Sequence, residues 1–332
     1  MLYLCGNNTQ GMINENYKVS ILTPVYNVSN YIERCARSLF EQTYDNLEFI
    51  FVDDCTPDNS MEILSRVIKD YPQRKEQLKI IHNDKNKGLA AVRNILTKLA
   101  DGTFIMHVDS DDWIEKDTTE KLVNKQIQTG ADIVSCNSVL EESSHQSLIQ
   151  LPQKSAPHEM IMEFLKSPNN HQIWGRLIRT SLYNQIVGAR EGLDNGEDTL
   201  VTPQLFYYAQ KLANVDEPLY HYFQGNKTSL THKEIRNKVN TKARIQIIQN
   251  SILLRDFFKG KDKELENQAN SHIALQIWDS SKHCARRDKQ AFKQMWAYRK
   301  YVDGNPFLSF AGKWGKLGVF WRSHYYCVSF IR

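Results

Sequence analysis

The chain has 332 residues, enough for about two domains, and its 41% hydrophobic content is ordinary for a globular protein. Its six cysteines are scattered without a CxxC pair, which argues against a zinc ribbon or a disulfide scaffold and suits a reducing cytosol. No apolar run is long enough to span a bilayer as a helix, and the opening MLYLCGNNTQGM lacks the features of a signal peptide. We therefore expect a cytoplasmic protein, with either Met1 or Met12 as its natural start.

The net charge of +4 hides an uneven distribution. Residues 233–332 contain 20 Lys and Arg against 8 Asp and Glu, or +12, which leaves 22 against 30, or −8, for residues 1–232. An acidic body is thus followed by a basic tail, which faces either an anionic surface or solvent. We expect no nucleic-acid partner.

The first 136 residues alternate between short apolar runs and helical patterns. The apolar runs are KVSILTP (18–24), LEFIFVD (47–53), LKIIH (78–82), TFIMHVD (103–109) and ADIVSC (131–136). Between them, apolar residues recur at helical spacing, as in 32–40 and 89–99. Near-continuous apolar strands that alternate with amphipathic helices predict an α/β fold with a largely parallel sheet, covered on both faces.

Polar segments follow each of the first four predicted strands. They are TPVYN (23–27), VDDCTPDNS (52–60), NDKNKGLAAVRN (83–94) and DSDDW (109–113). Ligands of parallel sheets bind at the carboxyl ends of the strands. Four such segments at one edge of the sheet therefore predict a polar ligand there.

The remaining elements are less regular. A helix-like segment (158–166), the stretch WGRLIRTSLYNQ (174–185) and a Gly/Asp-rich loop (190–198) follow in turn. We expect a helix after this loop with Pro203 in its first turn, where proline is tolerated. From Lys233 to about Met295, amphipathic patterns predict further helices.

The acidic segment DSDD (109–112) places three carboxylates within four positions. Such neighbours raise each other's pKa unless a cation neutralises them. Asp109 and Asp111 flank one residue at a strand end, so both can reach one divalent ion. Oxygen ligands suit Mg²⁺ or Mn²⁺, which also bind phosphate. One alternative is a solvated turn that caps the helix after Trp113. Another is the nucleophilic Asp-x-Asp of haloacid dehalogenase-type enzymes, although that motif usually lies at a domain's first strand.

A second acidic pair, Asp53 and Asp54, follows the second predicted strand. These carboxylates could accept hydrogen bonds from a nucleobase or a ribose hydroxyl, or could simply form a turn. No GxGxxG follows the first strand and no GxxxxGK[ST] occurs, which argues against a dinucleotide-binding dehydrogenase and a P-loop enzyme.

Taken together, VSILTPVYN, SLFEQTYDNLEFIFVDD, NKGLAAVRN and FIMHVDSDDW resemble, in order and spacing, the inverting glycosyltransferases of family 2. The resemblance is strong over residues 17–140, moderate over 170–232 and absent beyond about 235. It implies the GT-A fold, a Rossmann-like nucleotide-binding domain with a mostly parallel sheet flanked by helices. It divides the chain into an N-terminal extension (1–16), a GT-A domain (17–232, with a nucleotide-sugar half at about 17–140 and an acceptor half at about 141–232) and a helical, basic C-terminal region (233–332).

The resemblance also assigns roles on the nucleotide side by position. It places Pro24, Tyr26 and Asn27 around the nucleotide, Asp53 or Asp54 at the base, and Arg93 near the nucleotide or its phosphates. Asp109 and Asp111 match the family's metal-binding Asp-x-Asp motif, with Mn²⁺ or Mg²⁺ as the ion. Structural alternatives remain: Tyr26 could pack in the core, and Arg93 could be a solvated helix residue.

On the acceptor side, NGEDTLVTP (195–203) matches a Glu-Asp pair whose aspartate acts as general base, which assigns that role to Asp198 with Glu197 beside it. The alternative is an acidic helix N-terminus stabilised by the helix dipole. Trp174 is assigned to substrate binding, although its segment WGRLIR departs from the family's W-x-K-L-Y-R at Arg176 and Ile178.

The implied activity is transfer of a hexosyl or N-acetylhexosaminyl group from a nucleoside diphosphate sugar, preferably a UDP-sugar, to an acceptor hydroxyl with inversion. A glycan or lipid-linked acceptor in surface polysaccharide synthesis would fit. The alternative is a catalytically inactive relative that binds nucleotide or acts as a scaffold. Two interpretations stay open for the aromatic, basic segment 305–332: peripheral contact with anionic lipid at the inner face of the membrane, or packing on the catalytic domain.

Overall fold

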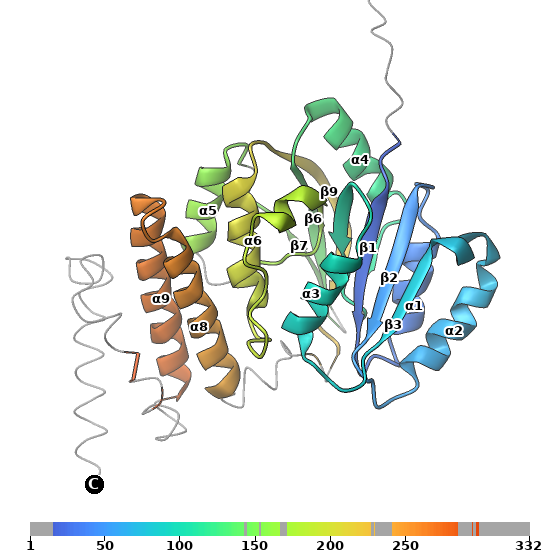
Figure 1. Cartoon of the computed structure of the whole chain (residues 1–332), viewed down its shortest axis with the longest axis horizontal. Helices are drawn as coiled ribbons and strands as arrows, with labels where there is room; N and C mark the ends of the chain where they lie inside the picture. The colour runs from blue at the N-terminus through green and yellow to red at the C-terminus, as the bar shows by residue number, and fades with distance from the viewer. Residues whose placement is uncertain are drawn as a thin grey trace, which may run out of the picture.

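The computed structural model describes residues 16–142, 145–152, 154–166, 171–226 and 241–284, with the isolated residues 229, 294, 297 and 298. They form a central sheet with helices on both faces and a helical layer beside it (Figure 1). Nearly all of the predicted N-terminal extension and the whole of segment 305–332 lie outside the described residues, so the membrane prediction for 305–332 stays a prediction.

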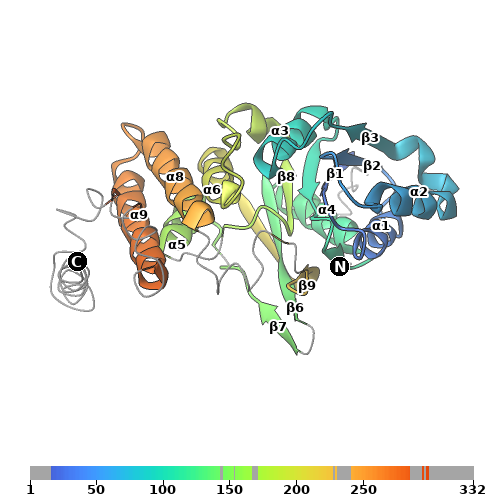
Figure 2. The same ribbon diagram turned by 90° about the horizontal axis from the view of Figure 1, so that it is seen from below.

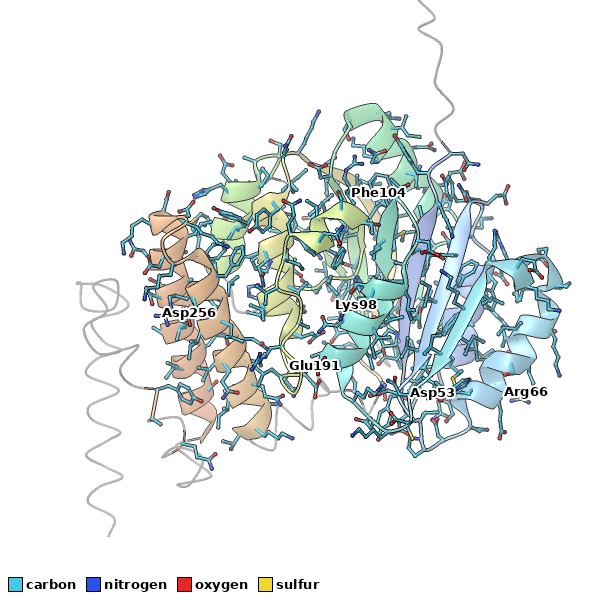
Figure 3. The ribbon with its side chains drawn as sticks, viewed as in Figure 1. Asp53, Arg66, Lys98, Phe104, Glu191 and Asp256 are labelled. Atoms are coloured by element: carbon cyan, nitrogen blue, oxygen red, sulfur yellow. The ribbon has the colours of Figure 1, made fainter. Side chains whose placement is uncertain are left out.

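The first half of the sheet is parallel, as predicted. Its order is β3 (Leu78–His82), β2 (Leu47–Asp53), β1 (Val19–Val25) and β4 (Phe104–His107). All four strands match predicted apolar runs. Their carboxyl ends meet at one edge, called here the carboxyl edge, and Figure 3 shows Asp53 at this edge and Phe104 at the opposite one.

Helices on both faces explain why these strands are apolar at almost every position. Ile21 and Phe49 belong to a core shared with α1 (Ile32–Phe40) and α2 (Ser60–Asp70). Alternate residues, such as Leu22, point to the other face and pack with α3 (Leu89–Leu99). A strand buried on both faces loses the alternating polar pattern of a half-exposed strand.

The second half of the sheet is mixed. After β4 come β8 (Arg176–Arg179), β6 (Ile133–Glu142), β9 (Leu212–Phe223) and the short β5 (Trp113–Ile114). The β8 strand is antiparallel to both neighbours and β5 is antiparallel to β9, whereas β6 and β9 are parallel. The strand β7 (His145–Ile149) pairs antiparallel with β6 and projects with it from the sheet (Figure 2).

The helices α5 (Pro157–Lys166), α6 (Glu197–Tyr208), α8 (Thr241–Phe258) and α9 (Lys263–Cys284) form a second core. Each helix contributes buried residues to this core, for example Phe164 from α5, Leu205 from α6, Leu254 from α8 and Leu265 from α9. This core therefore joins residues on both sides of the predicted domain boundary at 232. The remaining elements are α4 (Thr118–Thr129) and two short 3₁₀ helices, Pro72–Gln77 and Thr180–Asn184.

The expectation that Pro203 lies in the first turn of its helix is wrong. The helix α6 begins at Glu197, so Pro203 lies inside it. A proline there removes one backbone hydrogen bond. The early start places Glu197 and Asp198 in the first turn, where the helix dipole favours negative charge.

The acidic segment does not cap the helix after Trp113, because α4 begins only at Thr118, after Asp117. Among the described helices, none is long and apolar enough to cross a membrane.

We predict that Gly102→Ala destabilises the sheet. The Gly102 N–H donates to Ser20 Oγ (2.9 Å) and Glu48 Oε1 (3.0 Å), and an added Cβ would lie 2.7 Å from the Ser20 backbone nitrogen. Overpacking of this kind lowers the free energy of unfolding by about 1–3 kcal/mol, measurable by urea denaturation. The exposed Gln128→Ala is the control, expected within about 0.5 kcal/mol of the wild type. Equal stability of the two variants would contradict the prediction.

Candidate active site

The structure brings the polar segments at the carboxyl edge together through backbone hydrogen bonds. The Asp54 N–H donates to Val25 O (3.0 Å), and the Asn83 N–H donates to Asp53 O (2.8 Å). The segments after β1, β2 and β3 therefore lie side by side, as the strand order requires.

Asp54 organises the loop after β3. Its carboxylate accepts hydrogen bonds from the Lys87 and Gly88 N–H groups (both 2.9 Å) and from Asn83 Nδ2 (2.8 Å). Asp53 makes fewer contacts: it accepts from the Thr56 N–H (2.8 Å) and pairs with His82 Nδ1 (2.9 Å). Asp53 is thus the better placed of the two for the predicted contact with a base.

The segment after β1 exposes one aromatic side chain. Tyr26 is 47% exposed, so it does not pack in the core, and Pro24 before it is half-buried. Asn27 has a φ of 56°, a left-handed conformation that asparagine adopts more readily than most residues, and its N–H donates to Thr56 Oγ1 (2.8 Å). An exposed ring beside a fixed turn is a suitable surface for a planar ligand group.

The three carboxylates of the acidic segment have different partners. Asp109 Oδ1 pairs with Arg93 Nη2 (2.9 Å), and Asp111 Oδ2 accepts from Asn226 Nδ2 (2.8 Å). Asp112 is fully buried and accepts from the Tyr220 hydroxyl (2.6 Å) and the Phe223 N–H (2.8 Å). Asp112 is therefore structural, whereas Asp109 and Asp111 are half-buried and face the edge.

Burial and the charge of Asp109 raise the pKa of Asp111 to about 6, although its hydrogen bond from Asn226 acts in the opposite direction. A divalent cation would relieve this repulsion. Among the described residues, no group of three or more His, Cys, Asp and Glu side chains is arranged to hold a metal. Two carboxylates still suit Mg²⁺ or Mn²⁺, because such ions commonly take their other ligands from substrate phosphate and water.

Arg93 connects the acidic segment to the predicted general base. It lies on α3, is 6% exposed, and pairs through Nε with Glu197 Oε1 (2.7 Å) and through Nη2 with Asp109 Oδ1 (2.9 Å). It is therefore no solvated helix residue. Burial raises the pKa of Glu197 while Arg93 opposes the rise, and burial likewise raises the pKa of Asp198.

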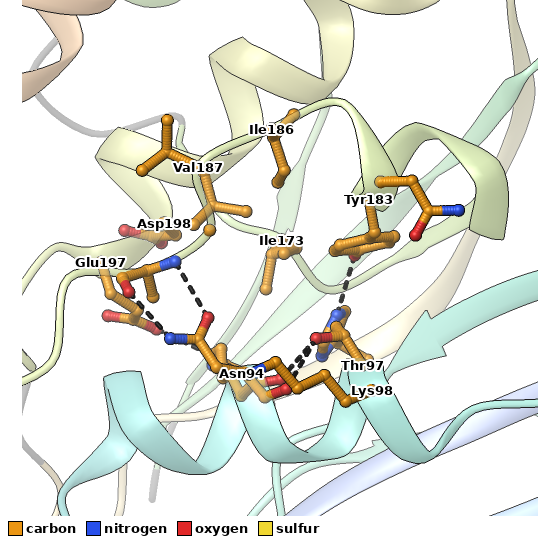
Figure 4. Close-up of a pocket in the computed structure, with 15 residues that line it drawn as sticks. Asn94, Thr97, Lys98, Ile173, Tyr183, Ile186, Val187, Glu197 and Asp198 are labelled. Carbon is orange, nitrogen blue, oxygen red and sulfur yellow. Dashed lines mark hydrogen bonds and ion pairs between the residues drawn. The ribbon is translucent and has the colours of Figure 1, made fainter.

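A cavity of about 270 Å³ lies between α3 and residues 183–189, with Glu197 and Asp198 at one end (Figure 4). Its other walls combine polar and apolar side chains, among them Asn94, Lys98, His107, Ile173, Tyr183, Ile186, Val187 and Val201. The space beside Asp198 can therefore receive a group that has both hydroxyls and an apolar face.

Trp174 is buried at 6% exposure rather than open to the edge. Its ring stacks on Tyr220 (centroids 4.4 Å apart) and on Tyr222 (5.3 Å). The Tyr220 hydroxyl accepts from the Asp109 N–H (3.2 Å) and donates to Asp112, so Trp174 supports the residue that orders the acidic segment. Direct substrate contact by Trp174 stays a prediction.

The sequence assigned no individual role to Tyr220, Asn226 or Asp194, although 219–232 resembles a segment of the family pattern. The Asp194 carboxylate accepts from the Ala90 N–H (3.0 Å) at the start of α3, although 104 positions separate them. Only its place in the Gly/Asp-rich loop could have pointed to it. No local pattern reveals a contact over such a distance.

Comparison with known proteins shows that this chain is similar to glycosyltransferases. Residues 20–180 match the sequence model described as "Glycosyl transferase family 2", a stretch that includes the acidic segment and ends before Glu197. EpsJ of Bacillus subtilis (strain 168), named an uncharacterized glycosyltransferase, is 33% identical over 222 residues, covering 64% of this chain and 62% of EpsJ. The chain thus corresponds to about three fifths of that relative's length.

Solved structures give the fold. A crystal structure of TarS from Staphylococcus aureus has a TM-score of 0.64 at 19% identity, covering 87% of this chain and 49% of TarS, and TarS 1–349 has also been solved with UDP-GlcNAc (TM-score 0.55). The mannosyltransferase PcManGT from Pyrobaculum calidifontis, in complex with GDP-Man and Mn²⁺, has a TM-score of 0.51 at 14% identity, covering 87% of this chain and 83% of PcManGT. The fold is therefore GT-A, as predicted.

We predict that Tyr220→Phe lowers stability, because it leaves the buried Asp112 carboxylate and the Asp109 N–H each without one partner. An unsatisfied buried group costs about 1–3 kcal/mol, so urea denaturation should show a loss of that size. Tyr26→Phe, at an exposed tyrosine, is the matched control and should leave stability unchanged. If Tyr220→Phe behaved like the control, the hydroxyl would not be ordering the segment.

Proposed function

Residues 20–180 belong to glycosyltransferase family 2, and on that premise we propose that the protein transfers a sugar from a nucleoside diphosphate sugar to an acceptor hydroxyl, with inversion at the anomeric carbon. One observation carries the proposal. The carboxyl edge, with Asp53, Asp109 and Asp111, is joined through Arg93 to the Glu197–Asp198 pair. A donor-binding edge and a candidate base therefore lie within one connected site.

On the donor side, Tyr26 would contact the base or ribose, and Pro24 and Asn27 would shape the surface around it. Asp53 would accept a hydrogen bond from the nucleotide, while Asp54 would hold the loop after β3. A UDP-sugar is the preferred donor because TarS, which shares the fold, has been solved with UDP-GlcNAc. Single pocket side chains set the sugar and the base, so the proposal stops at the donor class.

Asp109 and Asp111 would hold a divalent ion, Mn²⁺ or Mg²⁺. When bound, the ion would offset the charge that develops on the leaving diphosphate. Two facts support this role: both carboxylates are only half-buried, and the pKa of Asp111 is raised by burial and by Asp109.

Asp198 would act as general base. Direct displacement requires the acceptor hydroxyl to lose a proton as it attacks the anomeric carbon. Burial raises the pKa of Asp198, which makes its carboxylate a stronger base than an exposed aspartate. Arg93 would keep the charges of Glu197 and Asp109 compensated while Asp198 takes up the proton.

The acceptor would be a glycan or a lipid-linked saccharide, with its reactive hydroxyl beside Asp198 and part of its ring in the cavity. Two relatives support a role in surface polysaccharide synthesis: TarS, named a poly(ribitol-phosphate) beta-N-acetylglucosaminyltransferase, and TuaG of Bacillus subtilis, whose name refers to teichuronic acid biosynthesis.

The second candidate is a relative without catalysis that binds nucleotide or serves as a scaffold. The intact DSDD and GED segments argue for the enzyme, because a relative that had lost catalysis would be expected to have lost one of them. Calorimetry with UDP-sugars, with and without Mn²⁺, followed by assays of donor hydrolysis and transfer, separates the two. Binding with no turnover across a broad acceptor panel would favour the scaffold.

Asp198→Asn is expected to reduce turnover by about 10²–10⁴-fold, the usual contribution of a general base. Donor affinity should stay nearly unchanged, since Asp198 would contact the acceptor; calorimetry and a product assay measure the two quantities. A collapse of donor binding would instead indicate a structural role for Asp198 and make Glu197 the candidate base.

Asp111→Asn is expected to remove most of the dependence of turnover on Mn²⁺, because one of two proposed ion ligands loses its charge. Turnover measured across a Mn²⁺ titration tests this. Asp70→Asn, at an exposed carboxylate on α2, is the control and should titrate like the wild type. Near-normal metal-dependent turnover in Asp111→Asn would show that the metal assignment is wrong.

A further inference from the structure

The loop of residues 190–196, which leads into the Glu197–Asp198 pair, is bonded to the C-terminal helix α8. Gln246 Oε1 accepts from the Asn195 N–H (3.1 Å) and from Asn195 Nδ2 (2.6 Å), while its Nε2 donates to Gly192 O (2.8 Å). One turn further along α8, Asn250 Nδ2 donates to Leu193 O (3.3 Å) and Asn195 O (3.1 Å). Two side chains of one helix thus bond to three residues of the loop, Gly192, Leu193 and Asn195.

Both side chains are buried, Gln246 at 5% exposure and Asn250 at 0%. A buried amide is unfavourable unless it is hydrogen-bonded, and here the bonds run mainly to loop backbone. The helices α6 and α8 also approach each other closely, because a Cβ added at Gly196, the residue before α6, would lie 3.0 Å from Ile247 Cγ1 on α8. The N-terminus of α6 is therefore packed directly against α8.

The loop needs such bonds because its backbone is permissive. Gly192 and Gly196 adopt φ values of 82° and 73°, which glycine reaches easily and can also leave easily. Asp194 fixes the same loop on its other side by accepting from the Ala90 N–H on α3, the helix that carries Arg93. Between these attachments the loop sets where α6 begins, and so where its first two side chains lie.

We propose that Gln246 and Asn250 are positioning residues for catalysis, which place Asp198 by fixing the 190–196 loop. The inference rests on the proposed transferase function. It makes α8 part of the active site, although α8 lies beyond the residues that match the family and beyond the predicted catalytic domain. An error of about 1 Å in the position of a reacting group can reduce rates by about 10²-fold.

The test compares Gln246→Ala and Asn250→Ala with Gln249→Ala in the full chain. Gln249 is a half-buried glutamine on the same helix and makes no hydrogen bond to the loop among the described contacts. Rates of hydrolysis or transfer with UDP-GlcNAc and Mn²⁺ give kcat, calorimetry gives donor affinity and the fraction of binding-competent protein, and hydrogen exchange reports on the Asn195 amide.

The two test variants should lose about 10- to 100-fold in kcat, with donor affinity and binding stoichiometry within twofold of the wild type and faster exchange at Asn195. Gln249→Ala should match the wild type in kcat, in donor affinity and stoichiometry, and in exchange at Asn195. Turnover equal to that of Gln249→Ala would overturn the inference. So would a drop in binding stoichiometry that fully accounts for the lost rate, since this would indicate a merely structural role. An inactive wild type would overturn the proposed function itself, and the inference with it.

Discussion

The double ion pair of Arg93 is the interaction on which the site depends. Asp109, Glu197 and Asp198 lie in a desolvated region where like charges repel strongly, and Arg93 places a positive charge between the first two. Removing one partner of a buried pair costs about 3–5 kcal/mol, because the remaining charge is left uncompensated. Arg93 also joins α3, the segment after β4 and α6, so the electrostatic balance and the geometry of the site have one common origin.

Several acidic residues at the edge hold loops in place. Asp54 accepts backbone N–H groups from the loop after β3, Asp112 accepts one from β9, and Asp194 accepts one from the start of α3. Each satisfies a donor that would otherwise be left without a partner at a strand or helix end. The proposed mechanism assigns roles to three other carboxylates of this edge, Asp53, Asp109 and Asp111. The acidic composition of this edge therefore reflects architecture as much as chemistry.

The sequence was sufficient for the parallel half of the sheet and for the meeting of its polar segments at one edge. Strands covered on both faces are apolar throughout, so β1 and β2 could be predicted from the sequence. The strand order of the structure then brings residues 26–27, 53–54 and 109–112 together. The roles of individual carboxylates were not readable, because they depend on partners far along the chain. Nothing in DSDD distinguishes Asp112 from Asp111 until Tyr220 is placed beside it. The start of α6 was misjudged for a related reason: packing in the second core outweighs the local preference of Pro203.

The bonds between α8 and the 190–196 loop also bear on the order in which the protein is built. Chains are synthesised from the N-terminus, and domains begin to fold as they emerge. The strands that form the carboxyl edge all precede residue 108, whereas Asn195 meets Gln246 51 positions later in the chain. A growing chain can therefore assemble its nucleotide-side sheet well before the helix that fixes the other half of the site has left the ribosome. Under the proposed function, catalysis therefore depends on residues that are synthesised late, and the earlier part of the chain by itself would be a binding domain without its general base.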